Sequence, residues 1–347
     1  MIDPRLAHPL TTQETNMHND KFSRRQMLAA AIAGSMATAL HPVAAAQPDG
    51  FPAKPVRLVV PYGAGGPTDT HLRVIAQQAG ALLKQPVIID NKPGANGTFG
   101  AAELARAQPD GYTIAVLPAS VYREPYLNRV NFDPMKLTYL MGMTDYTFGL
   151  AVRQDAPWKN WSDFLADARR RPGKVSVGAA GPVQTPSIVL GELVQTVNVD
   201  FNRVPYKGDA EQATDLLGGH IDAGVLSGMA SSHIQSGRMR YLVMFTPKRV
   251  PQFPDVPTLR EEGVDVVIES PYGIAGPEGL LSERARILHD AFKAALESAE
   301  GRKILDQLNQ PLNYRSSEEF AQYAKNTFTR EKGRMERFKS TFSTQPK

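Results

Sequence analysis

The sequence predicts a two-domain α/β fold in which each domain is a mainly parallel sheet flanked by helices. Two observations lead to this class. From Val56 onward, short β-branched runs alternate with segments of helical periodicity, which is the pattern of βα units. The alternation restarts beyond Phe148, and a chain of 347 residues is long enough for about two domains with their own cores.

The composition excludes several functional classes. A chain with 42% hydrophobic and 21% charged residues is typical of a soluble globular protein. Because there is no Cys, disulfide scaffolds, Cys-ligated metals, thiol nucleophiles and a lipidated Cys are excluded. The net charge of +4 is spread along the chain, so no nucleic-acid partner is expected. No metal-binding or cofactor motif is found, and the expected cofactor is none.

The first 46 residues read as a signal peptide rather than as part of the fold. A pair of arginines, Arg24 and Arg25, precedes an Ala-rich apolar stretch that ends in three alanines at Ala46. That stretch is too short and too weakly apolar to span a bilayer. The pattern is twin-arginine-like and predicts cleavage after Ala46, which places the mature protein in the periplasm and not in the membrane.

The first predicted domain opens with three βα units. Strands are expected at residues 56–60, 87–89 and 112–116, and they are separated by helices near residues 72–83 and 98–107. In the second, strands are expected at 149–152, 174–177, 201–204, 223–226 and 241–245. Asp209 is the expected N-cap of one helix, and Gly218 and Gly219 are expected to end it.

The chain is predicted to return to the first domain near Ser270. A strand at 272–275 is followed by a segment that reads almost entirely helical, with caps at Ser282 and at Ser316 with Glu319. Such a run of helices needs an existing sheet to pack against. The predicted lobes are therefore 47–148 plus 270–347 and 149–269, and the two crossing connections between them predict a hinge.

Four Gly-rich turns supply the main functional signal. They occupy residues 61–69, 91–98, 178–185 and 205–209, and each follows a predicted strand and precedes a predicted helix. Free N–H groups at a helix start attract anions, and ligands of open α/β sheets bind at the carboxyl ends of strands. Cations are few in and beside these turns, with Lys207 and Arg203 at the fourth, so the pattern favours a small carboxylate in a cleft.

Two other functional classes remain open at this point. An exported α/β hydrolase or isomerase would need a nucleophile and a base, and Ser227 and His233 are the only nearby pair. The sequence GVLSG at residues 224–228 does not match the spacing of a nucleophile elbow. A signalling protein with a degenerate pocket is the other alternative.

Motifs along nearly the whole chain from Phe51 onward resemble the tripartite tricarboxylate transporter receptor family, also called the Bug family of periplasmic solute-binding proteins. They are KPVRLVVP at 54–61, GGPTD at 65–69, QPVIIDNKPGA at 85–95, PDGYT at 109–113, RPGK at 171–174, VPYKG at 204–208 and DVPT at 255–258. Two departures fall in the turns: YGA at 62–64 stands where Phe-Pro-Pro is common, and the turn at 182–187 is one residue longer.

The resemblance implies a Venus-flytrap receptor that holds a small organic carboxylate between its lobes. It also implies delivery to a membrane transporter of the tripartite tricarboxylate type or to a sensor, a monomeric state and no enzymatic activity. The implied first-lobe contacts are Tyr62, Gly63, Gly66, Thr68, Asp69, Asn96 and Gly97, with Asp69 expected to cap a helix and shape its turn. The second-lobe candidates are Ala179, Ala180, Tyr206, Lys207, Gly208 and Asp209, and the polar candidates at strand ends are Ser120, Thr147 and Ser227.

Overall fold

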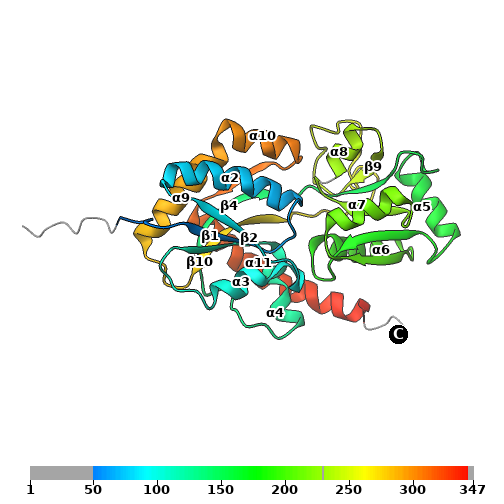
Figure 1. The fold of residues 1–347 in the computed structure, drawn as a ribbon. Coiled ribbons are helices and arrows are strands. Elements are labelled where there is room, and N and C mark those ends of the chain that lie inside the picture. Colours follow the sequence, from blue (N-terminus) through cyan, green and yellow to red (C-terminus); the bar gives the residue numbers. More distant parts are fainter. Residues whose placement is uncertain (1–49, 229, 343–347) are drawn as a thin grey trace, which may run out of the picture. The chain divides into compact units, whose positions relative to one another are not determined.

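The computed structural model describes residues 50–228 and 230–342. From Phe51 onward these residues belong to one compact unit built on two β-sheets with helices packed around them (Figure 1). The predicted signal peptide, residues 1–46, lies outside the described residues.

The first sheet has six strands in the order β11-β4-β10-β3-β1-β2. Its strands are β1 (Val56–Val60), β2 (Val87–Asn91), β3 (Thr113–Leu117), β4 (Leu137–Asp145), β10 (Pro271–Pro277) and β11 (Leu312–Arg315). Its helices are α2 (Pro67–Leu83), α3 (Phe99–Leu104), α4 (Glu124–Leu127), α9 (Ser282–Glu297), α10 (Ala299–Gln307) and α11 (Ser317–Phe342), with 3₁₀ turns η1 (Ala95–Gly97) and η2 (Ala119–Tyr122). The βα order of the first three strands explains their parallel pairing, because each helix returns the chain to the end of the sheet at which the previous strand began.

The second sheet has five strands in the order β7-β6-β8-β5-β9. Its strands are β5 (Gly149–Arg153), β6 (Ser176–Ala180), β7 (Asn202–Tyr206), β8 (Ala223–Leu226) and β9 (Met239–Met244). Its helices are α5 (Trp161–Arg170), α6 (Thr185–Val197), α7 (Asp209–Gly218) and α8 (Ala230–Gln235). Helix α5 begins at Asn160, whose side chain accepts a hydrogen bond from the backbone N–H of Asp163.

The sheets are mixed rather than mainly parallel. In the first, β10 pairs antiparallel with both β3 and β4, and in the second, β5 pairs antiparallel with both β8 and β9. The reason is the path of the chain: β5 and β10 are the strands that enter each sheet from the other one, so they do not arrive through a βα crossover.

Several local predictions were wrong. No element was expected between residues 116 and 148, where β4 lies, and the segment predicted as helical contains β11. The second strand of the second sheet spans Ser176–Ala180 instead of 174–177. Gly208 rather than Asp209 is the N-cap of α7, and Leu281 rather than Ser282 is the N-cap of α9. The capping box was correct: Ser316 and Glu319 exchange backbone-to-side-chain hydrogen bonds.

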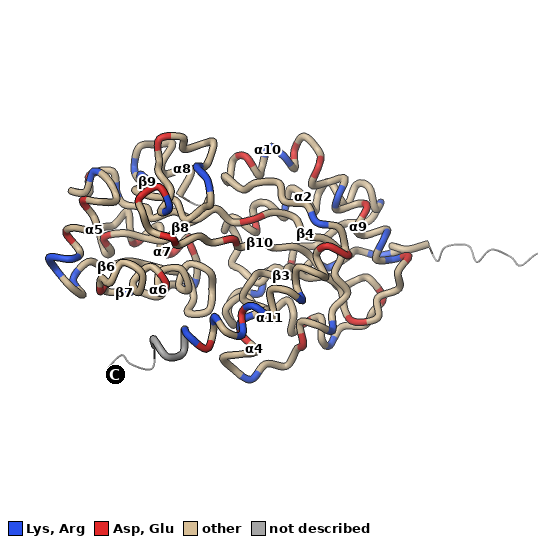
Figure 2. The backbone as a smooth tube through the Cα atoms, turned by 180° about the vertical axis from the view of Figure 1, so that it is seen from behind, with Lys and Arg blue, Asp and Glu red and all other residues tan. Residues whose placement is uncertain are grey.

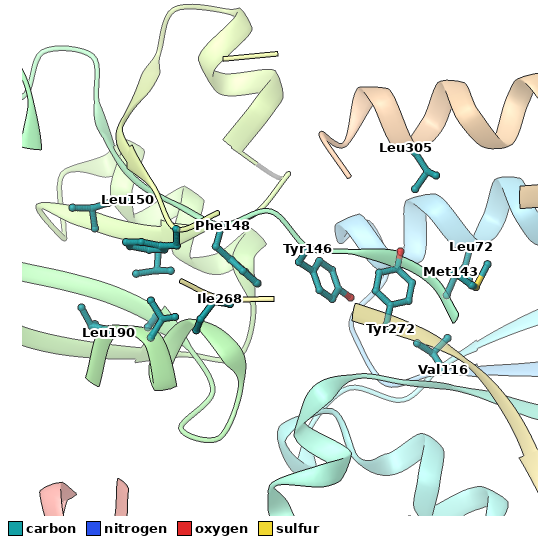
Figure 3. Close-up of a cluster of buried hydrophobic side chains, with 14 of the residues drawn as sticks. Leu72, Val116, Met143, Tyr146, Phe148, Leu150, Leu190, Ile268, Tyr272 and Leu305 are labelled. Atoms are coloured by element: carbon teal, nitrogen blue, oxygen red, sulfur yellow. The ribbon is translucent and has the colours of Figure 1, made fainter. Parts of the chain in front are cut away.

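Two connections cross between the sheets side by side. Tyr146 and Phe148 lie between β4 and β5, and the backbone N–H of Tyr146 donates to the carbonyl of Ser270 at 3.2 Å. The ring of Tyr146 stacks near those of Tyr272 and Phe148, with centroids 4.8 and 5.8 Å apart (Figure 3). These rings belong to a hydrophobic cluster that includes Leu72 of the first sheet's layer and Leu190 of the second's. Apolar packing is therefore continuous through the crossing.

Candidate functional site

A cavity of about 230 Å³ lies where the turns after β1, β2 and β3 meet the starts of α6 and α7. Its lining residues are Pro61, Tyr62, Gly63, Ala64, Gly66, Pro67, Thr68, Pro93, Gly94, Pro118, Ala119, Ser120, Tyr146, Phe148, Gln184, Thr185, Pro186, Lys207, Gly208, Asp209, Ala210, Glu211, Ser227 and Ser270. Because these residues come from both sheets and from both crossing connections, the cavity is formed between the two.

Three helices start at this cavity without a side-chain cap. The N-caps of α2, α6 and α7 are Gly66, Gln184 and Gly208, and none of them accepts a hydrogen bond through its side chain. The first N–H groups of a helix have no intrahelical acceptor, and the helix dipole makes that end positive. The convergence of three such ends creates a region that favours an anion.

Asp69 holds the turn after β1 in shape. Its Oδ2 accepts from the backbone N–H of Gly65 at 2.8 Å and from Arg73 Nε at 2.9 Å, and its Oδ1 accepts from Asn91 Nδ2 at 2.9 Å. Burial would raise the pKa of the Asp69 carboxyl, but these donors and the charge of Arg73 outweigh it and keep the pKa below its usual value. Asp69 thus shapes the turn but does not cap α2, whose N-cap is Gly66, and it is not part of the cavity lining.

Tyr62 and Ser120 line one wall, and Gly97 packs against both. Gly97 has a φ of +85°, and a Cβ added there would lie 3.2 Å from Tyr62 Oη and 3.3 Å from Ser120 Oγ. Burial, together with the nearby Asp209, raises the pKa of the Tyr62 phenol. The phenol therefore keeps its proton and can serve as a hydrogen-bond donor. The Ser120 hydroxyl is buried and has no hydrogen-bond partner among the described residues, so it is available to a ligand.

Asp209 faces the cavity from the start of α7. Its Oδ2 accepts from the backbone N–H of Ser227 at 3.0 Å and from Ser227 Oγ at 2.5 Å. Burial raises the pKa of the Asp209 carboxyl, and the two Ser227 donors offset this only in part. Lys207 is the single basic residue among those lining the cavity.

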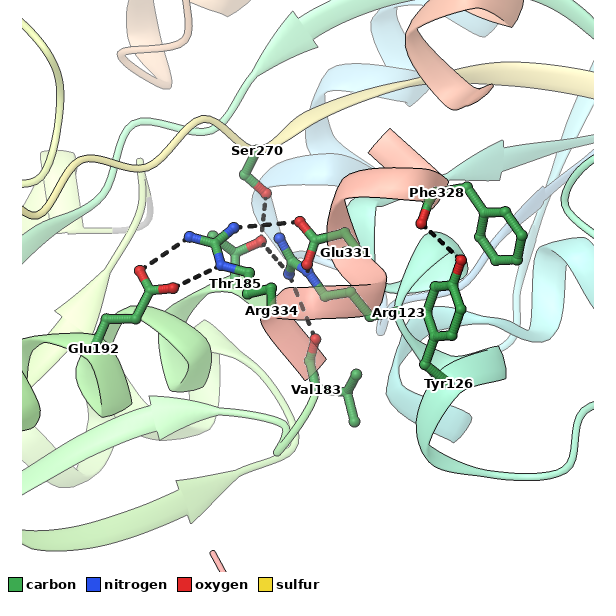
Figure 4. Close-up of polar contacts among 9 residues, drawn as sticks. All are labelled: Arg123, Tyr126, Val183, Thr185, Glu192, Ser270, Phe328, Glu331 and Arg334. Atoms are coloured by element: carbon green, nitrogen blue, oxygen red, sulfur yellow. Dashed lines mark hydrogen bonds and ion pairs between the residues drawn. The ribbon is translucent and has the colours of Figure 1, made fainter. Parts of the chain in front are cut away.

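Behind the cavity, four charged residues connect the two sheets; we call Arg123, Glu192, Glu331 and Arg334 the clasp. Arg123 Nε lies 3.1 Å from Glu331 Oε2, and both side chains are buried. Arg123 Nη1 also donates to Thr185 Oγ1 at 3.0 Å, at the first residue of α6. Figure 4 shows how α11 brings Glu331 and Arg334 against α6. Elsewhere along the described backbone, basic and acidic residues are interspersed (Figure 2).

Nine of the residues singled out from the sequence line this one cavity. They are Tyr62, Gly63, Gly66, Thr68, Ser120, Lys207, Gly208, Asp209 and Ser227. The other seven are Asp69, Asn96, Gly97, Thr147, Ala179, Ala180 and Tyr206, and none of them is part of the lining. The four turns therefore meet at one place, although not through every residue expected.

The residues outside the lining have other partners. Asn96 Nδ2 donates to the Glu124 carboxylate at 3.3 and 3.4 Å, Thr147 Oγ1 donates to the carbonyl of Asn309, and Tyr206 Oη donates to Asp215 Oδ2. Ala179 and Ala180 are strand residues of β6 rather than turn residues. Small residues are needed in this strand, because a Cβ at Gly178 would lie within 3.0 Å of the Ile221, Tyr206 and Gln212 side chains.

Sequence reasoning missed the part of the lining that comes from the crossing connections and from α6. These residues are Tyr146, Phe148 and Ser270 of the connections and Pro186 of α6, whereas Gln184 and Thr185 belong to the predicted turn at 178–185. A signal was present for some of them, because the predicted hinge points, Phe148 and Ser270, are themselves in the wall. Nothing local to Tyr146 indicates a cavity, since its position depends on packing against Tyr272.

The pair considered for hydrolysis does not form. Ser227 Oγ is bonded to Asp209, whereas His233 Nδ1 lies 2.7 Å from Arg238 Nη2. Among the described residues, no group of three or more His, Asp or Glu side chains is placed to hold a metal ion. The described helices include none that is both long and apolar enough to cross a membrane.

Comparison with known proteins identifies relatives over most of the chain. A model of the tripartite tricarboxylate transporter family receptor matches residues 71–339. A protein of Cupriavidus necator, named "UPF0065 protein in gbd 5'region", is 39% identical over 92% of this chain and 98% of its own length.

Solved structures share both the fold and the sequence family. The periplasmic binding protein BugD is 29% identical and superimposes with a TM-score of 0.78 over 84% of this chain and 98% of its own. MatC of Rhodopseudomonas palustris with bound malate is 27% identical, with a TM-score of 0.76 over 82% and 100% of the two chains. A further R. palustris protein, solved with adipate, is 26% identical, with a TM-score of 0.77 over 84% and 98%.

Proposed function

Because the chain belongs to the tripartite tricarboxylate transporter receptor family and is a solute-binding receptor, we propose that it captures a small organic carboxylate in the cavity between its two sheets. The observation that carries this proposal is the meeting of three uncapped helix starts around one cavity. Neutral donors, rather than a cluster of cations, then bind the anion. Malate and adipate in the two structural neighbours support the same ligand class.

Residues 47–148 with 270–347 act as one lobe in this proposal, and residues 149–269 act as the other. The two crossing connections at Tyr146–Phe148 and near Ser270 are the hinge. A ligand held by both lobes gains contacts in the closed form that the open form lacks, and this difference in affinity shifts the population toward closure. The Ser120 hydroxyl of one lobe and the helix starts of the other supply such contacts.

The finer parts of the role are proposed on the family and on the N-terminal sequence. The receptor works in the periplasm after removal of residues 1–46, and it delivers its ligand as a monomer to a tripartite tricarboxylate transporter or to a sensor. No catalytic step is part of this role. The cavity does not favour the alternative of a degenerate pocket, since it has both volume and polar groups.

Isothermal titration of residues 47–347 with a panel of small carboxylates and their neutral amides tests the proposal. We expect at least one acid to bind while its amide does not. The variant Ser120→Ala removes the unpartnered hydroxyl and should weaken that acid about tenfold, as loss of a hydrogen bond to a charged group does. Ser236→Ala, outside the cavity, is the matched control and should bind normally. Equal binding of acids and amides would contradict the proposal.

A further inference from the structure

The cavity that we assign to an anion also contains an acidic side chain. Asp209 lines it, and only one of its two carboxylate oxygens has donors among the described residues. Both of those donors, the backbone N–H and the hydroxyl of Ser227, point to Oδ2. No described residue donates to Oδ1.

No described Lys or Arg is paired with Asp209. Lys207 is the one basic residue of the lining, and the groups that act on the Asp209 carboxyl are the two Ser227 donors rather than Lys207. A second carboxylate placed against Oδ1 would therefore meet a like charge in a partly desolvated site, which is unfavourable. A hydroxyl or ammonium group placed there would instead satisfy the oxygen.

The lining thus has two complementary unpartnered groups on opposite sides. Ser120 Oγ, a donor, is on the six-stranded-sheet side, and Asp209 Oδ1, an acceptor, is on the five-stranded-sheet side. A ligand that bridges the lobes would match both if it carried an acceptor at one end and a donor at the other. Unsubstituted acids have only acceptors when ionised.

We propose that Asp209 is a specificity-determining residue that selects carboxylates bearing a hydroxyl or ammonium donor over unsubstituted acids of the same length. Asp209 Oδ1 accepts the hydrogen bond from that donor, while Ser227 holds the carboxylate group in place through Oδ2. This inference rests on the proposed function, because it concerns the ligand of the same cavity. It narrows the ligand class from any small carboxylate to hydroxy or amino carboxylates.

Titration calorimetry with matched acids tests the selection. Each set contains an unsubstituted acid of three to six carbons, its 2-hydroxy analogue and its 2-amino analogue, such as succinate, malate and aspartate. For the set that binds, we expect the hydroxy or amino acid to bind at least about tenfold more tightly than the unsubstituted one, in line with a hydrogen bond to a charged acceptor. Which of the two analogues prevails shows whether the donor is a hydroxyl or an ammonium group.

The variant Asp209→Asn carries the decisive comparison. An Asn can present its oxygen to Ser227 and its NH₂ group to the cavity, which exchanges an acceptor for a donor. The preference for the donor-bearing acid should then fall to less than about threefold or reverse. Asp155→Asn is the matched control, because Asp155 lies outside the cavity lining and is exposed in a pair with Arg153. It removes the same charge and should leave the preference unchanged.

The outcomes separate this inference from the proposed function. If unsubstituted acids, adipate among them, bind as tightly as their analogues, or if the preference survives in Asp209→Asn, the selection by Asp209 is wrong and the carboxylate receptor remains. If no acid of any set binds the folded wild-type protein, the proposed function fails and this inference with it. A thermal melt of each variant confirms that the protein compared is folded.

Discussion

Glu192 of α6 and Arg334 of α11 form a two-pronged ion pair, with Oε1 2.6 Å from Nε and Oε2 2.9 Å from Nη2. Helix α6 begins at the cavity and covers the five-stranded sheet, whereas α11 packs on β4 of the six-stranded sheet. Arg334 also contacts Glu331, which in turn pairs with Arg123. The clasp therefore joins the two proposed lobes at a place where no ligand atom is needed.

Removing the Glu192–Arg334 ion pair of the clasp should weaken ligand binding, although neither residue lines the cavity. In the proposed hinge motion, separation of the two lobes would break the Glu192–Arg334 pair, so the pair should favour closure. The Glu192 and Arg334 side chains are 33% and 21% exposed, and a pair of this kind contributes about 0.5–1 kcal/mol. For Glu192→Gln we expect a two- to fivefold rise in Kd, by the usual conversion of free energy to affinity, measured by titration with the acid that binds the wild type.

A control variant separates closure from general stability. Glu261→Gln breaks the pair with Arg249, whose two members lie within the second proposed lobe and are both nearly half exposed. It should leave Kd unchanged. If Glu192→Gln and Glu261→Gln bind the acid equally well, the clasp does not take part in closure.

The buried part of the clasp should matter more for stability. Burial would raise the pKa of the Glu331 carboxyl, but the charges of Arg123 and Arg334 outweigh it and lower that pKa below its ordinary value of 4.5. Replacing one partner of a buried pair leaves the other charge uncompensated, so Glu331→Gln should cost on the order of 3 kcal/mol at pH 7. Chemical denaturation measures the loss, and Asp155→Asn, in an exposed pair with Arg153, should cost less than about 1 kcal/mol.

The stability lost in Glu331→Gln should become smaller as the pH is lowered. A carboxyl whose pKa is lower in the folded state contributes stability above its unfolded pKa, and this contribution disappears as the pH falls through the folded value. The gap between wild type and Glu331→Gln should be constant above about pH 5.5 and shrink below pH 4.5. A gap that widened on acidification would contradict the assignment of the pair.

The strands and turns that the sequence predicted are those whose signals are local. The β-branched run at Val56–Val60 is followed by Gly-rich residues and a helical period, and strand, turn and helix all form there. The strand β4 was missed because its run of Leu, Tyr, Met and Gly has no clear alternation. It is a strand because Met141 pairs with Ile274 of β10, more than a hundred residues away.

The same distinction applies to the cavity. Lys207, Gly208 and Asp209 follow a strand directly, so their place at its carboxyl end could be predicted. The clasp could not, since Arg123 and Glu331 are 208 residues apart and nothing near either one indicates a partner. Asp209 was expected both as a helix cap and as a ligand contact: the cap is Gly208, whereas Asp209 lines the cavity and accepts hydrogen bonds from Ser227. The role of a buried charged side chain therefore depends on the residues that pack against it in the fold, and these cannot be read from its neighbours in the sequence.

Gly97 is expected to set the position of Tyr62 and Ser120 in the wall. An Ala at this position would have to adopt a φ of +85°, and its Cβ would press on the Tyr62 and Ser120 oxygens and on the Pro118 ring at 3.2–3.3 Å. For Gly97→Ala we expect a stability loss of about 1 kcal/mol from the backbone and a clear rise in Kd from the displaced wall. Calorimetric melting and titration with the bound acid measure the two effects.

The backbone term of Gly97→Ala can be measured on its own. Gly263 has a φ of +78°, and a Cβ there would have no atom within 4 Å. Gly263→Ala should therefore lose similar stability and keep the wild-type Kd. Equal Kd values for the two variants would show that the Gly97 contact does not position the wall.

The Asp209 carboxylate should destabilise the ligand-free protein at neutral pH. Its pKa is raised from the ordinary 3.8, chiefly by burial, so the folded state holds its proton more tightly than the unfolded state does. For a carboxyl shifted in this direction, stability is lost as the pH rises from the unfolded pKa through the folded one. Asp209→Asn, which keeps the shape and the Ser227 hydrogen bonds, should therefore melt a few degrees higher than wild type at pH 7.

This difference should close as the solution is acidified. As the pH falls well below 3.8, the Asp209 carboxyl becomes protonated in both states, and wild type and Asp209→Asn should then melt together. A variant Asp209→Asn that is less stable than wild type at pH 7 would mean that the carboxylate supports the fold. Greater stability would mean that it is retained in the cavity wall at a cost, as expected for a side chain that serves the ligand.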